Sequence, residues 1–310
     1  MEASDAKNPV EDGLEIDSRK NLTIKTPDTP KSQLIGVMCI LSRYDFSLPN
    51  INVNLYYNMR AKKSLGQNFL RDPKILKKIV DFARIEKDDI VVEVGPGEGT
   101  LTKLLLERAK RVIAIEKDHF LVEHLKEKFR EQILDDRLKI IEEDILDSDL
   151  KYNGYKLIGN IPYYITGAIF KKFLEAKKQP ESITFVVQKE VADRIIARDG
   201  KESILSISMK AYGEPQYGGV IKAGSFNPKP KVDSAIISIR NINRGKFKEA
   251  KIDGREFFEI LKRGFAHKRK LLIKNLGAEE EVFTKCDIPE NARAENLPVD
   301  KWICLAKNLL

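Results

Sequence analysis

The apolar residues of this chain follow two alternating patterns between about residue 72 and residue 240. Short runs rich in Val, Ile and Leu alternate with segments whose apolar residues recur at helical spacing. The runs predicted to be strands are "DIVVEV", "RVIAIEKD", "RLKIIEED", "YKLIGN" and "SITFVVQ", followed by "YGGVIKAGSF" and "SAIISIR". In "DPKILKKIVDFARI", Asp72 is the expected N-cap of a helix and Pro73 its first residue. Strands separated by helices predict an α/β fold with a doubly wound, mainly parallel, Rossmann-like sheet.

The composition of the chain divides it into three parts. Residues 1–33 carry many acids and few large apolar side chains, so burial cannot offset the entropy of ordering them and we predict disorder. The stretch that follows is more apolar but lacks a clear period, whereas Met59 begins a basic segment that resembles a natural start. We therefore expect 1–58 to be an N-terminal extension with no catalytic role, followed by the main α/β domain at 59–244. A helical pattern to the end predicts a small second domain at 245–310.

Charge and cysteine content indicate the kind of partner and the cellular compartment that we expect for the protein. It has 55 Lys and Arg against 47 Asp and Glu and a pI near 9.1, a balance that weakly favours a polyanionic partner. Cys39, Cys286 and Cys304 are odd in number and widely spaced, which argues against a disulfide scaffold or a zinc site and indicates a reducing compartment. No apolar run has the length of a membrane span, and "LIGVMCIL" lies too far from the start for a secretory signal. We expect a cytoplasmic monomer without a membrane segment or a metal.

A glycine-rich turn lies between the first of these strands and the next helix. In "VEVGPGEGT" it contributes Gly95, Gly97 and Gly99, which let the backbone approach a ligand closely. The dinucleotide fingerprint G-x-G-x-x-G would need glycine in place of Thr100, which disfavours a NAD dehydrogenase. Glu116 ends the next strand, where an acid can hold ribose hydroxyls, and Asp144 ends the third. Glycines and acids together favour an adenosine-containing cofactor.

The segment "NIPYYIT", after the fourth predicted strand, carries polar and aromatic groups beside a proline. Proline lacks an N–H and biases Ile161 away from the helical conformation. The side-chain oxygen of Asn160 and the carbonyl of Ile161 are then both available to accept from an exocyclic amine such as that of adenine. Hydrogen bonds to both amine protons draw the nitrogen toward tetrahedral geometry and localise its lone pair, while Tyr163 can stack on the base. We expect Tyr164, in contrast, to be a core aromatic beside the turn.

From about Lys62 to the C-terminus the chain resembles the KsgA-type small-subunit rRNA adenine dimethyltransferases. The resemblance rests on an ordered set of motifs: "KKSLGQNFL", "VEVGPGEGTLT", "VIAIEKD", "EEDIL", "GNIPYYIT", "SFNPKPKVDSA" and "FAHKRKLLIKNL". It implies S-adenosylmethionine as cofactor, with contacts at Asn68, Leu70, Gly95, Gly97, Glu116, Asp144 and Asn160. It also implies that Asn160, Pro162 and Tyr163 line the target amine, with Phe226 as the second aromatic on the adenine.

The resemblance further implies the reaction and its partner. The family transfers two methyl groups to each of two adjacent adenines in the 3′-terminal hairpin loop of 16S-type rRNA, so the partners would be this rRNA and the immature small ribosomal subunit. A sulfonium methyl is already activated, so alignment replaces a nucleophilic side chain or a metal and can supply roughly 7–11 kcal/mol of the barrier. The alternatives are a 23S rRNA adenine methylase and a non-catalytic ribosome-assembly factor of the same fold. "SFNPKPKVDS" and "AHKRKLLIKNL" favour the small-subunit enzyme.

A basic segment near the C-terminus is the expected RNA contact. "KRGFAHKRKLLIK" contains six Lys and Arg and no acid. We predict a helix here whose buried stripe consists of Phe258, Leu261, Phe265, Leu272 and Leu276. Lys268, Arg269 and Lys270 would then project from the opposite side toward RNA phosphates.

Overall fold

The computed structural model describes residues 14–17, 21–24 and 66–310. Its contacts divide the chain into two compact units between Arg60 and Ala61. In the first unit, β1 (Leu14–Asp17) and β2 (Asn21–Ile24) pair as an antiparallel hairpin. The hairpin lies within the stretch for which disorder was predicted, and the rest of the proposed 1–58 extension lies outside the described residues.

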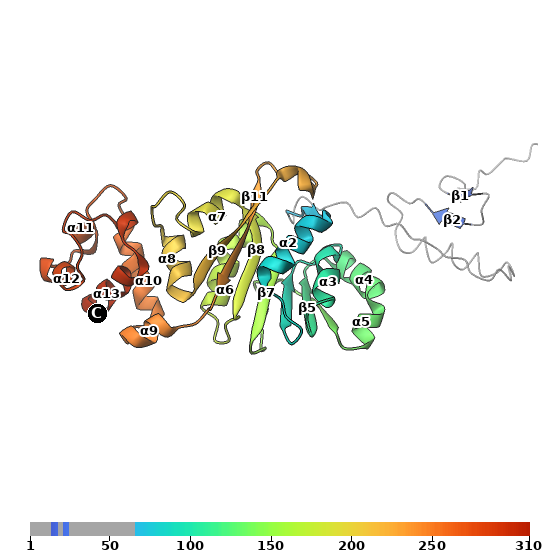
Figure 1. Ribbon diagram of the computed structural model, residues 1–310, viewed down its shortest axis with the longest axis horizontal. Coiled ribbons are helices and arrows are strands. Elements are labelled where there is room, and N and C mark those ends of the chain that lie inside the picture. Colours follow the sequence, from blue (N-terminus) through green and yellow to red (C-terminus); the bar gives the residue numbers. More distant parts are fainter. Residues whose placement is uncertain (1–13, 18–20, 25–65) are drawn as a thin grey trace, which may run out of the picture. The chain divides into compact units, whose positions relative to one another are not determined.

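The second unit is built on a seven-stranded sheet with the order β6-β5-β4-β7-β8-β11-β9 (Figure 1). Its strands are β4 (Ile90–Val94), β5 (Arg111–Glu116), β6 (Leu138–Glu142), β7 (Tyr155–Asn160), β8 (Ser182–Gln188), β9 (Glu214–Ile221) and β11 (Ser234–Arg240). Neighbours from β6 to β8 are parallel, whereas β11 is antiparallel to both β8 and β9. The predicted doubly wound sheet is confirmed, and the chain order reverses at β4.

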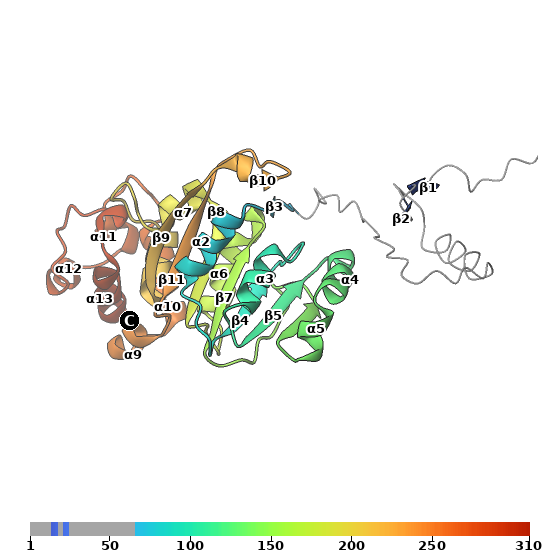
Figure 2. The ribbon, with the colours of Figure 1, turned by 45° about the vertical axis from the view of Figure 1, so that its right-hand side comes forward.

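Alternate residues of the strands pack into two separate cores. In β4, Val91 packs with α2 (Pro73–Ala83) and α3 (Thr100–Leu106), whereas Val92 packs with α6 (Thr166–Leu174). Helix α2 crosses the middle of the sheet (Figure 2). The other helices of this part are α4 (His119–Lys128), α5 (Arg130–Leu134), α7 (Lys189–Ile195) and α8 (Ile204–Tyr212). Because both faces are covered, the strands read as continuous apolar runs.

The start of α2 confirms a detail predicted from the sequence. The side chain of Asp72 accepts a hydrogen bond from the Lys74 N–H at 2.9 Å, and Pro73 occupies the first helical position. These two features satisfy or remove donors that the helix itself leaves unpaired. Helix α2 therefore begins at Pro73, as its sequence predicts.

Helices alone make up the end of the chain. They are α9 (Gly245–Ala250), α10 (Gly254–Gly264), α11 (Leu272–Leu276), α12 (Glu280–Lys285) and α13 (Val299–Leu309). Trp302 of α13 is completely buried, and its ring stacks on Phe265 with the ring centroids 5.4 Å apart. The expected helical C-terminal region is therefore present, packed around one buried indole. No helix in the described part of the chain is long and apolar enough to cross a bilayer.

The predicted helix through the basic segment is wrong. Helix α10 ends at Gly264 and residues 265–271 are irregular, so the three basic residues of the predicted RNA contact lie in a loop. The side-chain amide of Asn275 donates to the carbonyls of Gly264 (2.7 Å) and His267 (3.1 Å), which satisfies carbonyls that a continued helix would have bonded internally. Of the predicted stripe, Leu261, Leu272 and Leu276 are buried, whereas Phe258 and Phe265 are only partly buried.

The cysteines also differ from expectation. Cys286 and Cys304 form a disulfide, although the spacing of the cysteines argued against one. The pairing joins the end of α12 to α13, two helices that pack against each other. Helix packing brings the two residues together across 18 positions, and no local sequence pattern records that contact. Cys39 lies outside the described residues.

We expect a chain shortened to begin at Met59 to fold and melt like the full-length protein. The second unit has its own buried core, and the composition of 1–33 offers little apolar surface to add to it. Thermal unfolding followed by circular dichroism should differ by less than about 2 °C, corresponding to under about 1 kcal/mol. A decrease of more than about 5 °C would mean that the removed residues stabilise the second unit.

Candidate functional site

The carboxyl ends of four parallel strands meet at one edge of the sheet, beside a cavity of about 210 Å³. Ligands of open α/β sheets bind at such an edge, where the strand order reverses. The cavity is lined by all the cofactor contacts predicted from the resemblance: Asn68, Leu70, Gly95, Gly97, Glu116, Asp144 and Asn160. Pro162 and Tyr163 line it as well. The fold therefore gathers residues that are far apart in sequence into one site.

The turn after β4 is shaped by left-handed glycines. The φ angles are 63°, 57° and 73° at Gly95, Gly97 and Gly99. A Cβ at Gly95 would meet nothing within 4 Å, so backbone conformation alone favours glycine there. A Cβ at Gly99 would lie 2.5 Å from the ring of Phe129, so close packing excludes it as well. The turn thus leaves its backbone uncovered at Gly95.

Glu116 is a buried carboxylate held by the backbone. It ends β5, is 6% exposed, and accepts hydrogen bonds from the N–H groups of Gly97 (3.2 Å), Lys117 (2.9 Å) and Asp118 (2.9 Å). Burial raises the pKa of Glu116, and the three N–H bonds act against that rise. A carboxylate fixed in this way can accept hydrogen bonds from ligand hydroxyls, in keeping with the ribose contact expected from the sequence.

Asp144 lies just after β6 at the rim of the cavity. Its Oδ2 accepts from the Lys117 ammonium at 2.6 Å and its Oδ1 from the N–H of Leu146 at 2.9 Å. These bonds, that of Lys117 foremost, lower the pKa of Asp144. The side chain is therefore ionised at neutral pH and available as an acceptor for a ligand amine.

The segment before α2 closes one side of the cavity. It contains the two-residue strand β3 (Phe69–Leu70), whose Leu70 is buried. The Thr100 hydroxyl donates to the carbonyl of Leu70 at 3.0 Å, and the Asn160 side-chain NH₂ donates to the carbonyl of Asn68 at 2.8 Å. Thr100, the residue that breaks the dinucleotide fingerprint, thus holds this segment against the start of α3.

The hydrogen bond from Asn160 to Asn68 fixes the orientation of the Asn160 side-chain amide. Because its NH₂ is used toward Asn68, Oδ1 is the atom left to accept a hydrogen bond from a target amine. Tyr163 begins the short 3₁₀ turn η2 (Tyr163–Ile165), and its hydroxyl bonds the Ser234 Oγ at 2.6 Å. Burial raises the pKa of Tyr163, so the hydroxyl stays protonated. That bond holds the ring at the cavity.

Two aromatic residues lie where the sequence analysis did not expect them. Tyr164 lies in the η2 turn and is 68% exposed at the cavity, so its assignment to the core is wrong. Phe226, the expected second aromatic on the adenine, lies in β10 (Phe226–Asn227), which pairs with β3. It is 4% exposed and packs in the core on the α2 side of the sheet, and it is not among the described residues that line the cavity.

One acid of this cavity was missed by the sequence analysis. Glu93 lies inside β4, is 1% exposed, and lines the cavity. Its Oε2 has no hydrogen-bond partner in the part of the chain that the structure describes. Burial raises the pKa of Glu93 to about 8. The signal was present in "VVEV", because an acid in a central strand covered on both faces cannot be solvated.

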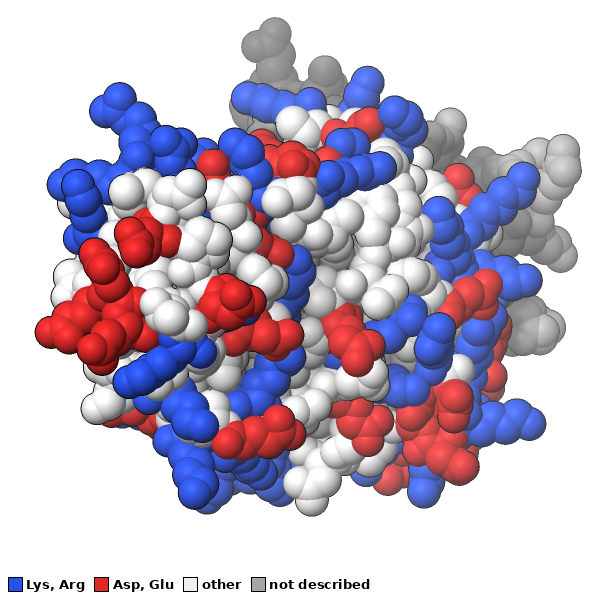
Figure 3. All heavy atoms as spheres, turned by 60° about the vertical axis from the view of Figure 1, so that its left-hand side comes forward, with Lys and Arg blue, Asp and Glu red and all other residues white. Residues whose placement is uncertain are grey.

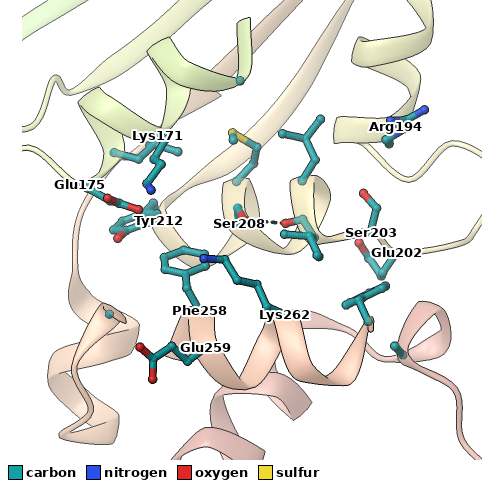
Figure 4. Close-up of a pocket in the computed structure, with 18 of the residues that line it drawn as sticks. Lys171, Glu175, Arg194, Glu202, Ser203, Ser208, Tyr212, Phe258, Glu259 and Lys262 are labelled. Atoms are coloured by element: carbon teal, nitrogen blue, oxygen red, sulfur yellow. Dashed lines mark hydrogen bonds between the residues drawn. The ribbon is translucent and has the colours of Figure 1, made fainter. Parts of the chain in front are cut away.

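A second, larger hollow of about 1,960 Å³ lies between the sheet's helices and the C-terminal helices. One wall comes from α6, α7 and α8 and the other from α9 and α10. Figure 4 shows side chains of both walls converging, among them Lys171, Tyr212, Phe258 and Lys262. Lys and Arg outnumber Asp and Glu in its lining. We call this hollow the helix-lined groove.

The predicted RNA-contacting residues lie at or near this groove. Lys268 lines it, and its Nζ is 3.8 Å from the Glu295 carboxylate. Arg269 and Lys270 are exposed in the same loop. Basic and acidic side chains form separate clusters on the face that carries the C-terminal helices (Figure 3). A polyanion on this face would therefore be held at particular positions rather than by a uniform field.

Sheet order, glycine turn and strand-end acids define a Rossmann-like methyltransferase. Two solved structures share the fold: a dimethyladenosine transferase from Plasmodium falciparum has a TM-score of 0.68 and 26% identity, covering 76% of this chain and 95% of that one. The 23S rRNA methyltransferase ErmE has a TM-score of 0.64 and 26% identity, covering 78% and 99%.

Sequence comparison then identifies the family. The model described as "Ribosomal RNA adenine dimethylase" matches residues 58–309. Proteins named "Ribosomal RNA small subunit methyltransferase A" from Fusobacterium nucleatum and Dehalococcoides mccartyi are each 40% identical to 80% of this chain, and the matches cover 97% and 89% of those proteins. The chain belongs to the ribosomal RNA adenine dimethylase family, which confirms the resemblance seen in its motifs.

We expect Gly99→Ala to lower the free energy of unfolding by about 2–3 kcal/mol, because it combines a left-handed φ with a clash against Phe129. Gly167→Ala is the matched control, since a Cβ there meets nothing within 4 Å and lies in a helix. The control should change stability by about 0–1 kcal/mol, in the stabilising direction. Urea denaturation measures both. Equal stabilities of the two variants would contradict the packing described for the turn.

Proposed function

We propose that this protein uses S-adenosylmethionine to dimethylate the N6 amines of two adjacent adenines in the 3′-terminal hairpin loop of small-subunit rRNA. The observation that carries the proposal is the Asn160–Pro162–Tyr163 corner, which opens onto a cavity lined by strand-end acids. The sequence relatives named as small-subunit methyltransferases are 40% identical to this chain, whereas the 23S enzyme is 26% identical. That difference favours the small-subunit substrate over the 23S alternative.

The cavity suits the parts of such a cofactor. Glu116 offers a fixed acceptor for ribose hydroxyls, and Asp144 an ionised acceptor for the adenine amine. The uncovered backbone at Gly95 leaves room beside both. When bound, the cofactor supplies a methyl group activated by its sulfonium sulfur. The residues of the chain then have to hold and align the acceptor amine.

Asn160 and Ile161 carry out that alignment. The Asn160 Oδ1 and the Ile161 carbonyl each accept a hydrogen bond from one N–H of the target amine, which stabilises the positive charge that grows on its nitrogen. No side chain needs to act as a nucleophile. The half-buried ring of Tyr163, held through Ser234, stacks on the extruded base. Extrusion costs a few kcal/mol, least for a loop base, and stacking returns about 1–3 kcal/mol per base.

The remaining surface accommodates the rest of the RNA. Tyr164 presents its exposed ring beside the catalytic corner and is available to stack on a neighbouring nucleotide. The basic loop with Lys268, Arg269 and Lys270 provides phosphate contacts at the helix-lined groove. Phe226 is buried, so in this proposal it supports the site through β3 rather than by touching the base. We propose that the enzyme acts as a cytoplasmic monomer on immature small subunits.

Methylation of immature small subunits and of protein-free large-subunit RNA tests the function. We expect the wild-type protein to form two dimethyladenosines in the small-subunit rRNA and none in the large-subunit RNA. Asn160→Ala removes one amine acceptor, so turnover should fall by roughly 10²–10³-fold. Methyl transfer to the large-subunit RNA alone would support a 23S rRNA adenine methylase. Absence of methyl transfer to both RNAs would support a non-catalytic ribosome-assembly factor.

The variants at Tyr163 are the matched controls for that experiment. Tyr163→Ala removes the stacking surface and should weaken methylation, whereas Tyr163→Phe keeps the ring and should retain most activity. Tyr163→Phe also leaves the buried Ser234 hydroxyl without this partner, so we expect it to lower stability by about 1 kcal/mol. Near-normal turnover of Asn160→Ala would disprove its role as an amine acceptor.

Replacing Lys268, Arg269 and Lys270 together by alanine should weaken RNA binding without changing cofactor affinity. Phosphate contacts release counterions, so the slope of log affinity against log salt should fall by up to about three units. Lys268 contributes least if it stays paired with Glu295, although its own side chain is exposed and the 3.8 Å separation makes the ion pair weak.

The control for this variant removes three exposed lysines at the amino-terminal end of the sheet, Lys87, Lys110 and Lys139. It carries the same charge change far from the groove and should leave the slope nearly unaltered. Binding of immature subunits is measured across a salt series. Equal slopes for both variants would place the RNA path elsewhere, such as beside the cavity along "GQNFLR".

A further inference from the structure

A short segment of the chain crosses the cofactor cavity. Residues 66–71, which we call the strap, lead into α2, and their strand β3 pairs with β10 (Figure 2). A site for a small-molecule ligand usually measures about 300–1,000 Å³, whereas this cavity measures about 210 Å³. The strap therefore has to move outward when such a ligand enters. The strap residues that line the cavity are Gly66, Gln67, Asn68, Phe69 and Leu70.

The strap is attached to the rest of the site by two kinds of bond. The carbonyls of Asn68 and Leu70 accept side-chain hydrogen bonds, and any residue at those positions would provide such an acceptor. Arg71 and Glu98 instead form an ion pair between side chains. The Arg71 Nε donates to the Glu98 Oε2 at 2.7 Å, and a second guanidinium nitrogen donates to Oε1. Two parallel bonds from a guanidinium give both strength and a fixed direction.

Glu98 is the fixed partner of this ion pair. It lies between Gly97 and Gly99, whose left-handed φ angles shape the glycine turn, and the Glu98 carbonyl accepts from the Lys128 ammonium at 2.6 Å. The side chain of Glu98 is 12% exposed, whereas that of Arg71 is 52% exposed. The carboxylate is thus held on the turn, and Arg71 is the partner that solvent and salt can reach.

The ion pair also keeps an aromatic ring against the turn. A Cβ at Gly97 would lie 3.1 Å from the ring of Phe69, so this ring packs directly on the glycine backbone. Phe69 lies two residues before Arg71 on the strap. Separation of Arg71 from Glu98 would let the ring withdraw from the turn and widen the cavity on this side.

We propose that the Arg71–Glu98 ion pair sets the rate at which the cofactor enters and leaves, by holding the strap closed across the cavity. The inference rests on the function proposed above, because the ligand that exchanges is S-adenosylmethionine or its demethylated product. In this role neither side chain contacts a reacting atom, so both are positioning residues.

The direction of the effect follows from where the ion pair acts. It joins two parts of the protein and not the ligand, so it stabilises the closed strap in the empty and in the occupied site alike. A contact that favours both states equally cannot change affinity. Its removal should therefore speed entry and departure by the same factor. For a bidentate pair with one largely buried partner, we expect a factor of roughly 3–10.

Surface plasmon resonance with the immobilised full-length protein measures both rate constants. S-adenosylhomocysteine is the probe, because it lacks the transferable methyl group. We expect Arg71→Gln to raise the association and dissociation rate constants together by roughly 3–10-fold, and to leave the dissociation constant within about twofold of wild type. Arg108→Gln is the matched control. It breaks an ion pair with Asp81 of α2, and neither residue is among the described residues that line the cavity, so both rate constants should stay unchanged.

Charge reversal and salt test whether the attachment is ionic. Arg71→Glu should speed exchange more than Arg71→Gln, because it places two carboxylates together. Combining Arg71→Glu with Glu98→Arg restores a pair of opposite charges and should slow exchange again. In wild type, raising NaCl from about 0.05 M to about 0.5 M should bring both rate constants toward those of Arg71→Gln, whose own rate constants should change little. The salt series uses the unaltered chain, so it tests the inference even if a reversed variant does not fold.

The outcomes separate this inference from the proposed function. If S-adenosylhomocysteine binds but Arg71→Gln exchanges it as slowly as Arg108→Gln does, the ion pair is only structural and the inference fails alone. A weaker affinity of Arg71→Gln caused by faster departure alone would also overturn it, because the ion pair would then act only on the occupied site. If wild type binds neither S-adenosylmethionine nor S-adenosylhomocysteine, the proposed function fails and the inference fails with it.

Discussion

The site depends on the parallel register between β4 and its two neighbours. Val94, the last residue of β4, is level with Ile115 of β5 and Gly159 of β7. The ladder continues one step further, because the Gly95 N–H donates to the Ile115 carbonyl at 3.0 Å. This register sets Glu116 and Asn160 on either side of the glycine turn. A shift by one residue would turn both side chains to the opposite face of the sheet.

The second constraint is how buried charge is accommodated at that edge. Glu116 and Asp144 are held by N–H groups and by Lys117, so each remains an acceptor. Glu93 lies deeper, its Oε2 has no hydrogen-bond partner among the described residues, and burial raises its pKa. The pKa values of Glu93 and Glu116 are thus raised by burial and that of Asp144 is lowered by its hydrogen bonds, so environment rather than residue type sets the direction.

The C-terminal helices add a second surface without entering the cofactor cavity. They pack around Trp302 and form one wall of the helix-lined groove, while α6, α7 and α8 form the other. Because α10 ends at Gly264, the basic residues that follow are presented on a loop at the groove. A loop can adjust to an RNA backbone more readily than a helix face can, at the expense of more ordering entropy on binding.

Most of the sheet's elements and the residues that line the cavity could be predicted from the sequence alone. The α/β alternation, the Asp72 cap, the glycine turn and the acids at strand ends are local patterns, set by periodicity and by residue type. Which aromatic side chain is exposed at the cavity depends on tertiary packing, since Tyr164 is exposed there and Phe226 is buried against distant segments. Tertiary packing also paired Cys286 with Cys304 and isolated Glu93, because pairing and burial are set by neighbours many positions away in the chain.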